Sequence, residues 1–374
     1  MTGGNRRVPS VVPFIVMRSA TARLTAIGIV TACAYSQLSC GSSSVTDPDA
    51  GGGNPPPATG RTPLTELAQQ AYLGFPGALY PGGNVPPVRH DSVGRAERAR
   101  IRPLDAAGNP AANGRYVLLS IGMSNTTQEF CGTSPPAACN SWTFAGQAAA
   151  DPAVNRTALV IANGAAGGQS AAFWDAPSDA NYDRVRGQVL APLGVGERQV
   201  QAAWVKVANP GPSVSLPAGS ADAYTLVRQM GDIVRAMRQR YPNLRQVFFS
   251  SRISAEFANT NLNPEPYAYE SGFSVKWVIE AQIQQAVSNV GDPRAGDLRY
   301  DATPWLAWGP YIWGGQSATS AGAITWTRQD LAADGTHPSQ SGQQKVGTAL
   351  LAFFKGSPYT ACWFLAGQAC QGGD

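Results

Sequence analysis

Five short apolar runs recur between residues 116 and 308, each rich in β-branched or aromatic side chains. Their hydrophobicity is nearly continuous rather than alternating, which is typical of strands that are covered on both faces. The sequence therefore predicts five strands, at residues 116–121, 158–162, 200–207, 246–249 and 304–308.

Helical patterns separate these runs and follow the last one. Apolar residues from Leu226 to Tyr241 recur at spacings that keep them on one helical face, and Pro242 ends the pattern. Residues 275–287 repeat the pattern, and a last helix is predicted to begin near Pro338. Alternating strands and helices need crossover connections, so the sequence predicts an α/β fold with a mainly parallel five-stranded sheet and helices on both faces.

The main domain is predicted to span residues 116–357. Residues 62–115 precede it, hold many Gly and Pro and lack its rhythm, so we expect them to wrap the domain as strands and loops. Residues 358–374 form a C-terminal tail that contains Cys362 and Cys370. The role of residues 62–115 stays open at this level.

Residues 1–40 are typical of a targeting segment. Arg18 and Arg23 precede a mostly apolar run at 24–32, which is too short to span a membrane and matches the core of a signal peptide. This predicts export to a secreted or other extracytoplasmic location. Residues 41–61 are rich in Gly, Ser and Pro and are predicted to form a flexible linker.

Two cysteines of the targeting segment are candidates for lipidation. The sequence Val30-Thr31-Ala32-Cys33 resembles the lipobox of bacterial lipoproteins, and Leu38-Ser39-Cys40-Gly41 resembles it less closely. A lipid on Cys33 or Cys40 would anchor the protein to a membrane of the bacterial cell envelope. Simple cleavage of a secretion signal is the alternative.

The four remaining cysteines are expected to form disulfides in an exported protein. Cys131 and Cys139 bracket a Pro-Pro loop, and Cys362 and Cys370 lie close together in the tail. These two local pairs are our prediction, although four cysteines allow three connectivities. With no CxxC spacing and only two histidines, no metal or cofactor is predicted.

The charge pattern gives no reason to expect a nucleic-acid partner. A net charge of +4 is small for 374 residues, and most arginines are scattered. A small cluster of four arginines is interpreted as a solvated face. It comprises Arg95, Arg98, Arg100 and Arg102.

Polar residues that could carry chemistry follow the predicted strands. Ser124 follows the first strand, Gly168 lies in the loop after the second, and Asn209 follows the third. Asp334 and His337 directly precede the last helix. Because ligands bind at the carboxyl ends of strands in open parallel sheets, we expect these loops to converge. Each short motif alone also occurs in ordinary turns, so the prediction depends on the set.

This set resembles the SGNH (GDSL-type) hydrolase family over about residues 116–355. Gly-Met-Ser-Asn at 122–125 is similar to the GQSN form of the nucleophile motif in sialate O-acetylesterases and related carbohydrate esterases. Asp-Gly-Thr-His at 334–337 matches the DxxH motif, and Gly168 matches the glycine of the second block. The third block departs from the family's GxND, because Val-Ala-Asn-Pro at 207–210 lacks both its glycine and its aspartate.

The resemblance implies a three-layer α/β/α sandwich and hydrolysis of a carboxylic ester. A small-molecule or polysaccharide ester would be the substrate, and O-acetyl groups on a carbohydrate are the expected target. In such a mechanism Ser124 attacks the ester, His337 is the general base, and Asp334 orients the imidazole. The backbone N–H groups of Ser124 and Gly168 and the side-chain amide of Asn209 would form the oxyanion hole.

Several alternatives stay open. His90, in the irregular segment before the main domain, is the only other imidazole and the alternative to His337 as the base. It could instead line the pocket or serve structure only. The substrate could instead be a lipid or lysophospholipid, or the chain could be a non-catalytic glycan-binding protein on a hydrolase fold. Four tryptophans could stack on sugar rings, although burial in the core is the more frequent fate of Trp. They are Trp174, Trp204, Trp308 and Trp313.

Overall fold

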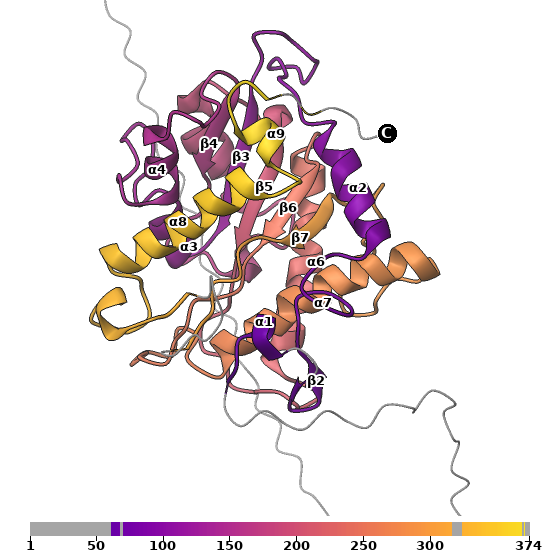
Figure 1. Cartoon of the computed structure of the whole chain (residues 1–374), viewed down its shortest axis with the longest axis vertical. Coiled ribbons are helices and arrows are strands. Elements are labelled where there is room, and N and C mark those ends of the chain that lie inside the picture. Colours follow the sequence, from indigo (N-terminus) through magenta and orange to yellow (C-terminus); the bar gives the residue numbers. More distant parts are fainter. Residues whose placement is uncertain (1–60, 68–69, 316–323, 369, 371–374) are drawn as a thin grey trace, which may run out of the picture. The chain divides into compact units, whose positions relative to one another are not determined.

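The five predicted strands form one parallel sheet in the computed structural model of the chain (Figure 1). The strands lie in the order β4-β3-β5-β6-β7, so the direction of strand addition reverses at β3. Such a reversal opens a crevice at the carboxyl ends of the strands on either side of it. The strands are β3 (Tyr116–Gly122), β4 (Leu159–Asn163), β5 (Val200–Lys206), β6 (Gln246–Phe249) and β7 (Trp305–Trp308).

The structure describes residues 61–67, 70–315, 324–368 and 370. The predicted targeting segment at 1–40, with Cys33 and Cys40, lies outside the described residues, as does all of the predicted linker at 41–61 except Arg61. Those predictions therefore stay predictions. Within the described residues no helix is long and apolar enough to cross a membrane.

Side chains of the sheet alternate between two cores, one on each face. Leu119, Val205 and Val247 belong to one cluster, while Leu118 and Trp204 belong to the other. These five side chains are fully buried, so both faces of the sheet are covered, which explains why the strands are continuous apolar runs rather than alternating ones. The predicted α/β fold with helices on both faces is confirmed.

One face of the sheet is covered mainly by two long helices that pack on each other. These are α6 (Asp222–Arg240) and α7 (Tyr267–Ser288), which correspond to the two predicted amphipathic patterns. Shorter elements complete this layer between β4 and β5. They are η1 (Ala171–Phe173), α5 (Ala180–Arg184), the π-helix η2 (Val185–Leu190), η3 (Ala191–Leu193) and η4 (Glu197–Gln199).

The opposite face is covered by helices from both ends of the α/β domain. The predicted last helix is α8 (Gln340–Gly356), which crosses the sheet and packs on α3 (Ser124–Phe130) and α4 (Phe144–Ala150) (Figure 1). The short turn η5 (Arg328–Asp330) leads into α8, and α9 (Ala361–Phe364) follows it. Phe144, Phe354 and Phe364 pack against one another in this layer.

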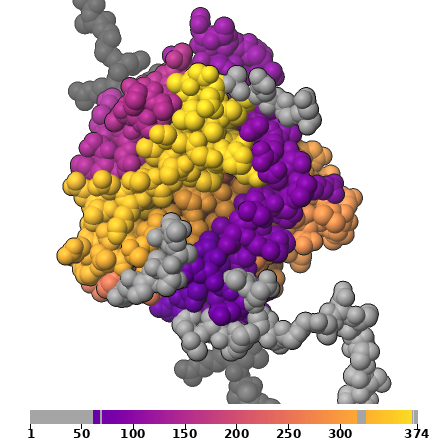
Figure 2. Space-filling model, viewed as in Figure 1, coloured from indigo at the N-terminus to yellow at the C-terminus, as the bar shows by residue number. Residues whose placement is uncertain are grey.

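The expectation of strands and loops for residues 62–115 holds only in part. This segment contains α1 (Leu64–Leu67), the two-residue strands β1 (Ala71–Tyr72) and β2 (Phe75–Pro76), and an unexpected helix, α2 (Val88–Arg98). Figure 2 shows the segment, in indigo and purple, as a band on the surface beside the yellow C-terminal residues. The band is anchored there because Arg98 donates to the carbonyl of Pro358 and Tyr359 donates to Asp91.

The segment at 62–115 also covers the outer edge of the sheet at β7. An edge strand exposes backbone groups that need partners. Tyr80 Oη accepts the N–H of Trp308 at 3.0 Å, and His90 Nε2 lies 2.7 Å from the carbonyl oxygen of Leu306. Gln282 of α7 accepts the N–H of Leu306 at 2.8 Å. Side chains thus supply the hydrogen-bond partners that a sixth strand would otherwise provide to the backbone of β7.

His90 therefore serves the structure of this edge. It lies in α2, which the sequence did not predict, and only 1% of its surface is exposed. Its Nε2–H donates to Leu306, so its Nδ1 accepts from the hydroxyl of Tyr300 at 2.7 Å. Burial lowers the pKa of His90 from 6.5 to about 4, and the hydrogen bond to Leu306 and the charge of Asp91 offset this only in part.

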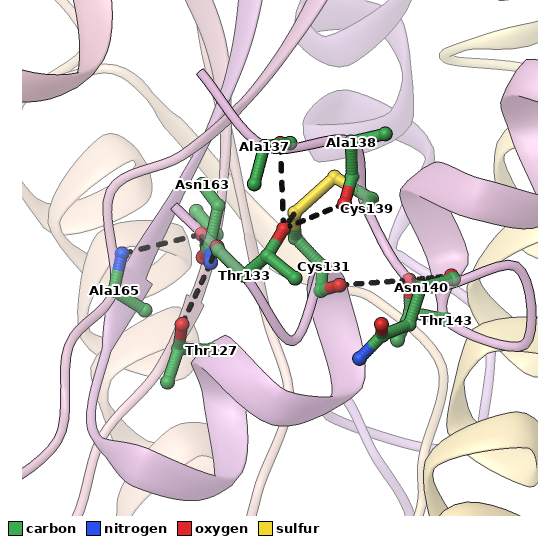
Figure 3. The surroundings of a disulfide bond; sticks show 11 residues. Thr127, Cys131, Thr133, Ala137, Ala138, Cys139, Asn140, Thr143, Asn163 and Ala165 are labelled. Atoms are coloured by element: carbon green, nitrogen blue, oxygen red, sulfur yellow. Dashed lines mark hydrogen bonds between the residues drawn. A yellow bond between two sulfur atoms is a disulfide. The ribbon is translucent and has the colours of Figure 1, made fainter. Parts of the chain in front are cut away.

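Both predicted disulfides are confirmed, as Cys131–Cys139 and Cys362–Cys370. The first closes a loop directly after α3 (Figure 3). The carbonyl of Cys131 accepts hydrogen bonds from the N–H of Asn140 and the hydroxyl of Thr143, so the loop is also held from within.

The neutral His90 predicts acid-sensitive stability. The unfolded chain takes up the proton near pH 6.5 and the folded one only near pH 4, so His90 supports folding above pH 6.5 and loses that support as the pH falls through 4. The loss should reach about 3 kcal/mol of unfolding free energy. Denaturant titrations of wild type and His90→Asn between pH 7 and about pH 4 measure it.

His90→Asn should be less stable at pH 7 and lose less than the wild type on acidification. If both proteins lose the same unfolding free energy between these pH values, the buried imidazole is not the source of the acid sensitivity.

Candidate active site

A small cavity lies where the strand order reverses, at the carboxyl ends of β3 and β5. Its volume is about 100 Å³, the space of a few water molecules. Three of the predicted site residues line it, Ser124, Gly168 and His337. The loops after the first two strands and before the last helix therefore converge, as the sequence predicts.

Ser124, His337 and Asp334 form a continuous hydrogen-bonded chain. Ser124 Oγ lies 2.8 Å from Nε2 of His337, and Nδ1 of His337 lies 2.5 Å from Oδ2 of Asp334. An ionised Asp334 can only accept, so Nδ1 carries the proton and Nε2 is left to accept from the serine hydroxyl. The arrangement is that of a nucleophile, a base and a group that orients the base.

The loop of Asp334 and His337 is fixed by its own hydrogen bonds. Oδ1 of Asp334 accepts the backbone N–H groups of Thr336 at 2.9 Å and of His337 at 3.0 Å. Burial would raise the pKa of Asp334, but the hydrogen bonds from His337 and from these amides outweigh it and lower the pKa to about 2. The carboxylate is therefore ionised at any ordinary working pH.

Gly335 lets this loop turn so tightly. Its φ is +64°, and a Cβ built on it would lie 1.8 Å from the carbonyl oxygen of Phe257. A residue with a side chain would clash with that carbonyl and strain the backbone of the loop that carries Asp334 and His337.

Asn125 ties the nucleophile to the same loop. It is buried in the first turn of α3, directly after Ser124, and its Nδ2 donates to the carbonyl of Thr336 at 3.0 Å. The contact joins two segments that are 211 residues apart in the chain. Asn125 belongs to the Gly-Met-Ser-Asn motif, but the motif alone does not reveal this contact.

Gly168 lies in the cavity wall, and a Cβ built on it would meet nothing within 4 Å. Its φ of +75° is the constraint that favours glycine, since other residues rarely adopt this conformation. Among the described residues, no backbone carbonyl accepts the N–H of Gly168.

The loop that carries Gly168 starts from a hydrogen-bonded cluster at the end of β4 (Figure 3). Asn163 donates to Thr127 Oγ1 at 2.6 Å and to the carbonyl of Thr133, and it accepts from Ser120 Oγ at 2.8 Å. Thr133 belongs to the loop closed by Cys131 and Cys139. The disulfide loop thus holds Asn163, the residue from which the loop of Gly168 begins.

Asn209 is not brought to the cavity. Ala208 and Pro210 line it, whereas Asn209 between them lines a neighbouring cavity, as expected when an extended segment alternates its sides. Its Nδ2 donates to Oε1 of Gln229 on α6 at 2.6 Å. The structure therefore does not place the side chain of Asn209 in the cavity, where the predicted third oxyanion donor would have to be.

The four candidate tryptophans are core residues. None is more than 3% exposed, and each indole N–H donates inside the protein. None of the four is accessible to a sugar ring. Of the two alternatives for these residues, the structure shows burial in the core. They are Trp174, Trp204, Trp308 and Trp313.

Three buried charged residues near the site escaped the sequence analysis. Glu129 of α3 and Lys206 at the end of β5 are both fully buried, with the ammonium 2.5 Å from each carboxylate oxygen. Arg252 lies three residues beyond β6 and lines the cavity. A charged residue at the carboxyl end of a buried strand is the signal that could have identified Lys206 and Arg252.

No protein-family model matches the sequence, and no curated protein matches it significantly. Among solved structures, the chain is similar to a carbohydrate esterase family 2 enzyme with a carbohydrate-binding domain from Corynascus thermopiles (Myceliophthora fergusii). The two share 13% identity and a TM-score of 0.33 over 64% of this chain and 66% of that one.

Two further solved structures show similar likeness. Salicylyl-acyltransferase SsfX3 from a tetracycline biosynthetic pathway is 14% identical, with a TM-score of 0.34 over 67% of this chain and 58% of that one. An extracellular lipase from Streptomyces rimosus is 11% identical, with a TM-score of 0.31 over 64% of this chain and 99% of that one.

Likeness of this degree carries no information about chemistry. The sheet and the loops of Ser124, Gly168, Asp334 and His337 are nevertheless features of the protein itself. They include the residues on which the resemblance of the sequence to the SGNH hydrolases rests.

Proposed function

We infer that this protein is an exported serine esterase that hydrolyses carboxylic esters through an acyl-enzyme. The observation that carries the inference is the hydrogen-bonded chain from Ser124 through His337 to Asp334, which opens into a cavity. A serine hydroxyl becomes an effective nucleophile only when a base takes its proton during attack, and His337 is in position to be that base.

The first half of the reaction forms the acyl-enzyme. Ser124 Oγ attacks the ester carbonyl while its proton passes to His337 Nε2, and the carbonyl π pair moves onto oxygen. The tetrahedral intermediate then collapses, the bond to the leaving alkoxide breaks, and His337 returns the proton to that oxygen. Asp334 stays ionised throughout and stabilises the imidazolium through the Nδ1–H bond.

The second half repeats these steps with water. His337 takes a proton from the water as its oxygen attacks the acyl carbon, and Ser124 leaves with that proton when the intermediate collapses. The products are a carboxylic acid and an alcohol, so no other reactant is needed. Fixed hydrogen bonds around Asp334 keep the base aimed at the serine in both halves.

Backbone N–H groups are the proposed oxyanion donors. Ser124 begins α3, where N–H groups have no acceptor within the helix, and Gly168 lies in the facing wall of the cavity. Donors preset for the developing charge lower the barrier without reorganising. The side-chain amide of Asn209 is left out of the proposed oxyanion hole, because it donates to Gln229 and lines a neighbouring cavity.

The size of the cavity supports a short acyl group. A volume of about 100 Å³ accommodates an acetyl group more readily than a long acyl chain. The carbohydrate alcohol is proposed from the resemblance of the Gly-Met-Ser-Asn motif alone, because the candidate tryptophans are buried. Export is proposed from the N-terminal pattern and is supported by the two disulfides.

Ester hydrolysis tests the proposed function. The full chain should hydrolyse p-nitrophenyl acetate, and kcat/KM should fall steadily as the acyl chain lengthens to octanoate. Ser124→Ala should lose activity by about 10³-fold or more. Ser288→Ala removes an exposed hydroxyl at the end of α7 and should match the wild type. A folded wild type that is inert on every ester would favour a glycan-binding protein instead.

Asn209→Ala tests the composition of the oxyanion hole. Since its amide faces Gln229 rather than the cavity, we expect kcat for p-nitrophenyl acetate to fall by less than about tenfold. A loss of about 10²–10³-fold, in a variant with an unchanged melting temperature, would show that the amide is an oxyanion donor after all.

A further inference from the structure

Arg252 is a buried cation in the wall of the catalytic cavity. It follows β6 in the segment Ser250-Ser251-Arg252, and only 1% of its surface is exposed. It lines the same cavity as Ser124 and His337. The proposed ester hydrolysis uses neither its charge nor its hydrogen-bond donors.

The guanidinium of Arg252 is not satisfied by the protein. Its Nε and Nη2 are buried and have no hydrogen-bond partner among the described residues. Arginine keeps its charge in a protein, and a buried charge without partners is costly. Burial lowers the pKa of Arg252, and the charges of Glu129, Glu265 and Asp334 only partly offset this.

Each of those three carboxylates is already engaged elsewhere. Both oxygens of Glu129 bind Lys206, and Asp334 binds His337. Glu265 accepts the indole N–H of Trp313 and the backbone N–H of Ala255 and of Tyr269. Arg252 Nε and Nη2 therefore lie beside the cavity without a carboxylate partner among the described residues.

A guanidinium presents donors in a planar fork that matches a carboxylate. We propose that Arg252 binds a carboxylate of the substrate, so that the enzyme selects esters that carry a carboxylate close to the ester bond. This inference rests on the proposed esterase function and names the class of its substrate. The carboxylate can belong to the alcohol part or to the acyl part, and the two are distinguishable.

Matched pairs of charged and neutral esters test the proposal. On the alcohol side, 3-acetoxybenzoate is compared with 3-acetoxybenzamide, which has nearly the same shape. On the acyl side, monomethyl succinate is compared with methyl succinamate. In at least one pair, the wild type should prefer the anion by about tenfold or more in kcat/KM. Equal rates within both pairs would overturn the proposal.

Variants assign the preference to Arg252. Arg252→Gln should lose about 10–100-fold in kcat/KM on the preferred anion and keep its activity on the neutral partner within about threefold. Arg252→Lys keeps the positive charge but not the planar fork of donors. Its kcat/KM on the preferred anion should lie between those of the wild type and Arg252→Gln. Arg89→Gln removes an exposed arginine of α2 and should keep the full preference. Equal losses on both partners would instead give Arg252 a role in folding or at the reacting carbonyl, and would overturn the proposal.

A binding measurement separates this proposal from the proposed function. Calorimetry on Ser124→Ala needs no hydrolysis, and the products 3-hydroxybenzoate and succinate are compared with 3-hydroxybenzamide and succinamide. At least one anion should bind about tenfold more tightly or better than its neutral partner, and the difference should vanish in Ser124→Ala/Arg252→Gln. If this binding preference is found but the wild type hydrolyses no ester, only the proposed esterase function is wrong. If the wild type hydrolyses esters but prefers no anion in rate or in binding, only the proposed carboxylate site is wrong.

Discussion

The hydrogen bond between Ser124 and His337 joins two loops that are 213 residues apart in the chain, and most of the fold keeps those loops in place. Ser124 is held at the end of the buried strand β3, and His337 is held by the turn that leads into α8. Because α8 packs on α3 and α4 across the same face of the sheet, the two loops cannot shift independently. Asn125 then fixes their spacing directly, through the carbonyl of Thr336.

Beneath this bond lies a layer of buried charge, which is unusual for a hydrophobic core. The Glu129–Lys206 pair joins α3 to the end of β5, and Lys206 also accepts the hydroxyl of Thr126 through its carbonyl. Removal of one member of such a pair is typically far more destabilising than replacement of both. Arg252 is a second cation in this layer, beside the cavity, and its unpaired N–H groups favour a negatively charged substrate group there.

The sequence predicts the parts of this fold that are controlled by apolar burial. The five strands are recognisable because both of their faces are covered, and α6 because its buried face is apolar. Helix α2 escaped prediction because its two buried residues are His90 and Gly94, which give no hydrophobic pattern. The catalytic loops were predicted because their residue types are needed for the chemistry and they lie at strand ends.

Other features depend on contacts that no local pattern contains. Asn209 points away from the cavity because an extended segment alternates its sides and Gln229 offers an acceptor, both of which need the packing of α6. The burial of Arg252 likewise follows from how the segment after β6 lies against α7, where Ser271 accepts its backbone N–H. Arginine is normally exposed, so only the tertiary structure reveals a buried one.

The most direct test of the account is to trap the acyl-enzyme. The full chain is mixed with excess p-nitrophenyl acetate, quenched in acid while the reaction runs, digested, and analysed by mass spectrometry. The account predicts a peptide that contains Ser124 and has gained one acetyl group, in the wild type and not in Ser124→Ala. Ester hydrolysis with no acetyl group on Ser124, or with the acetyl group on another residue, would contradict it.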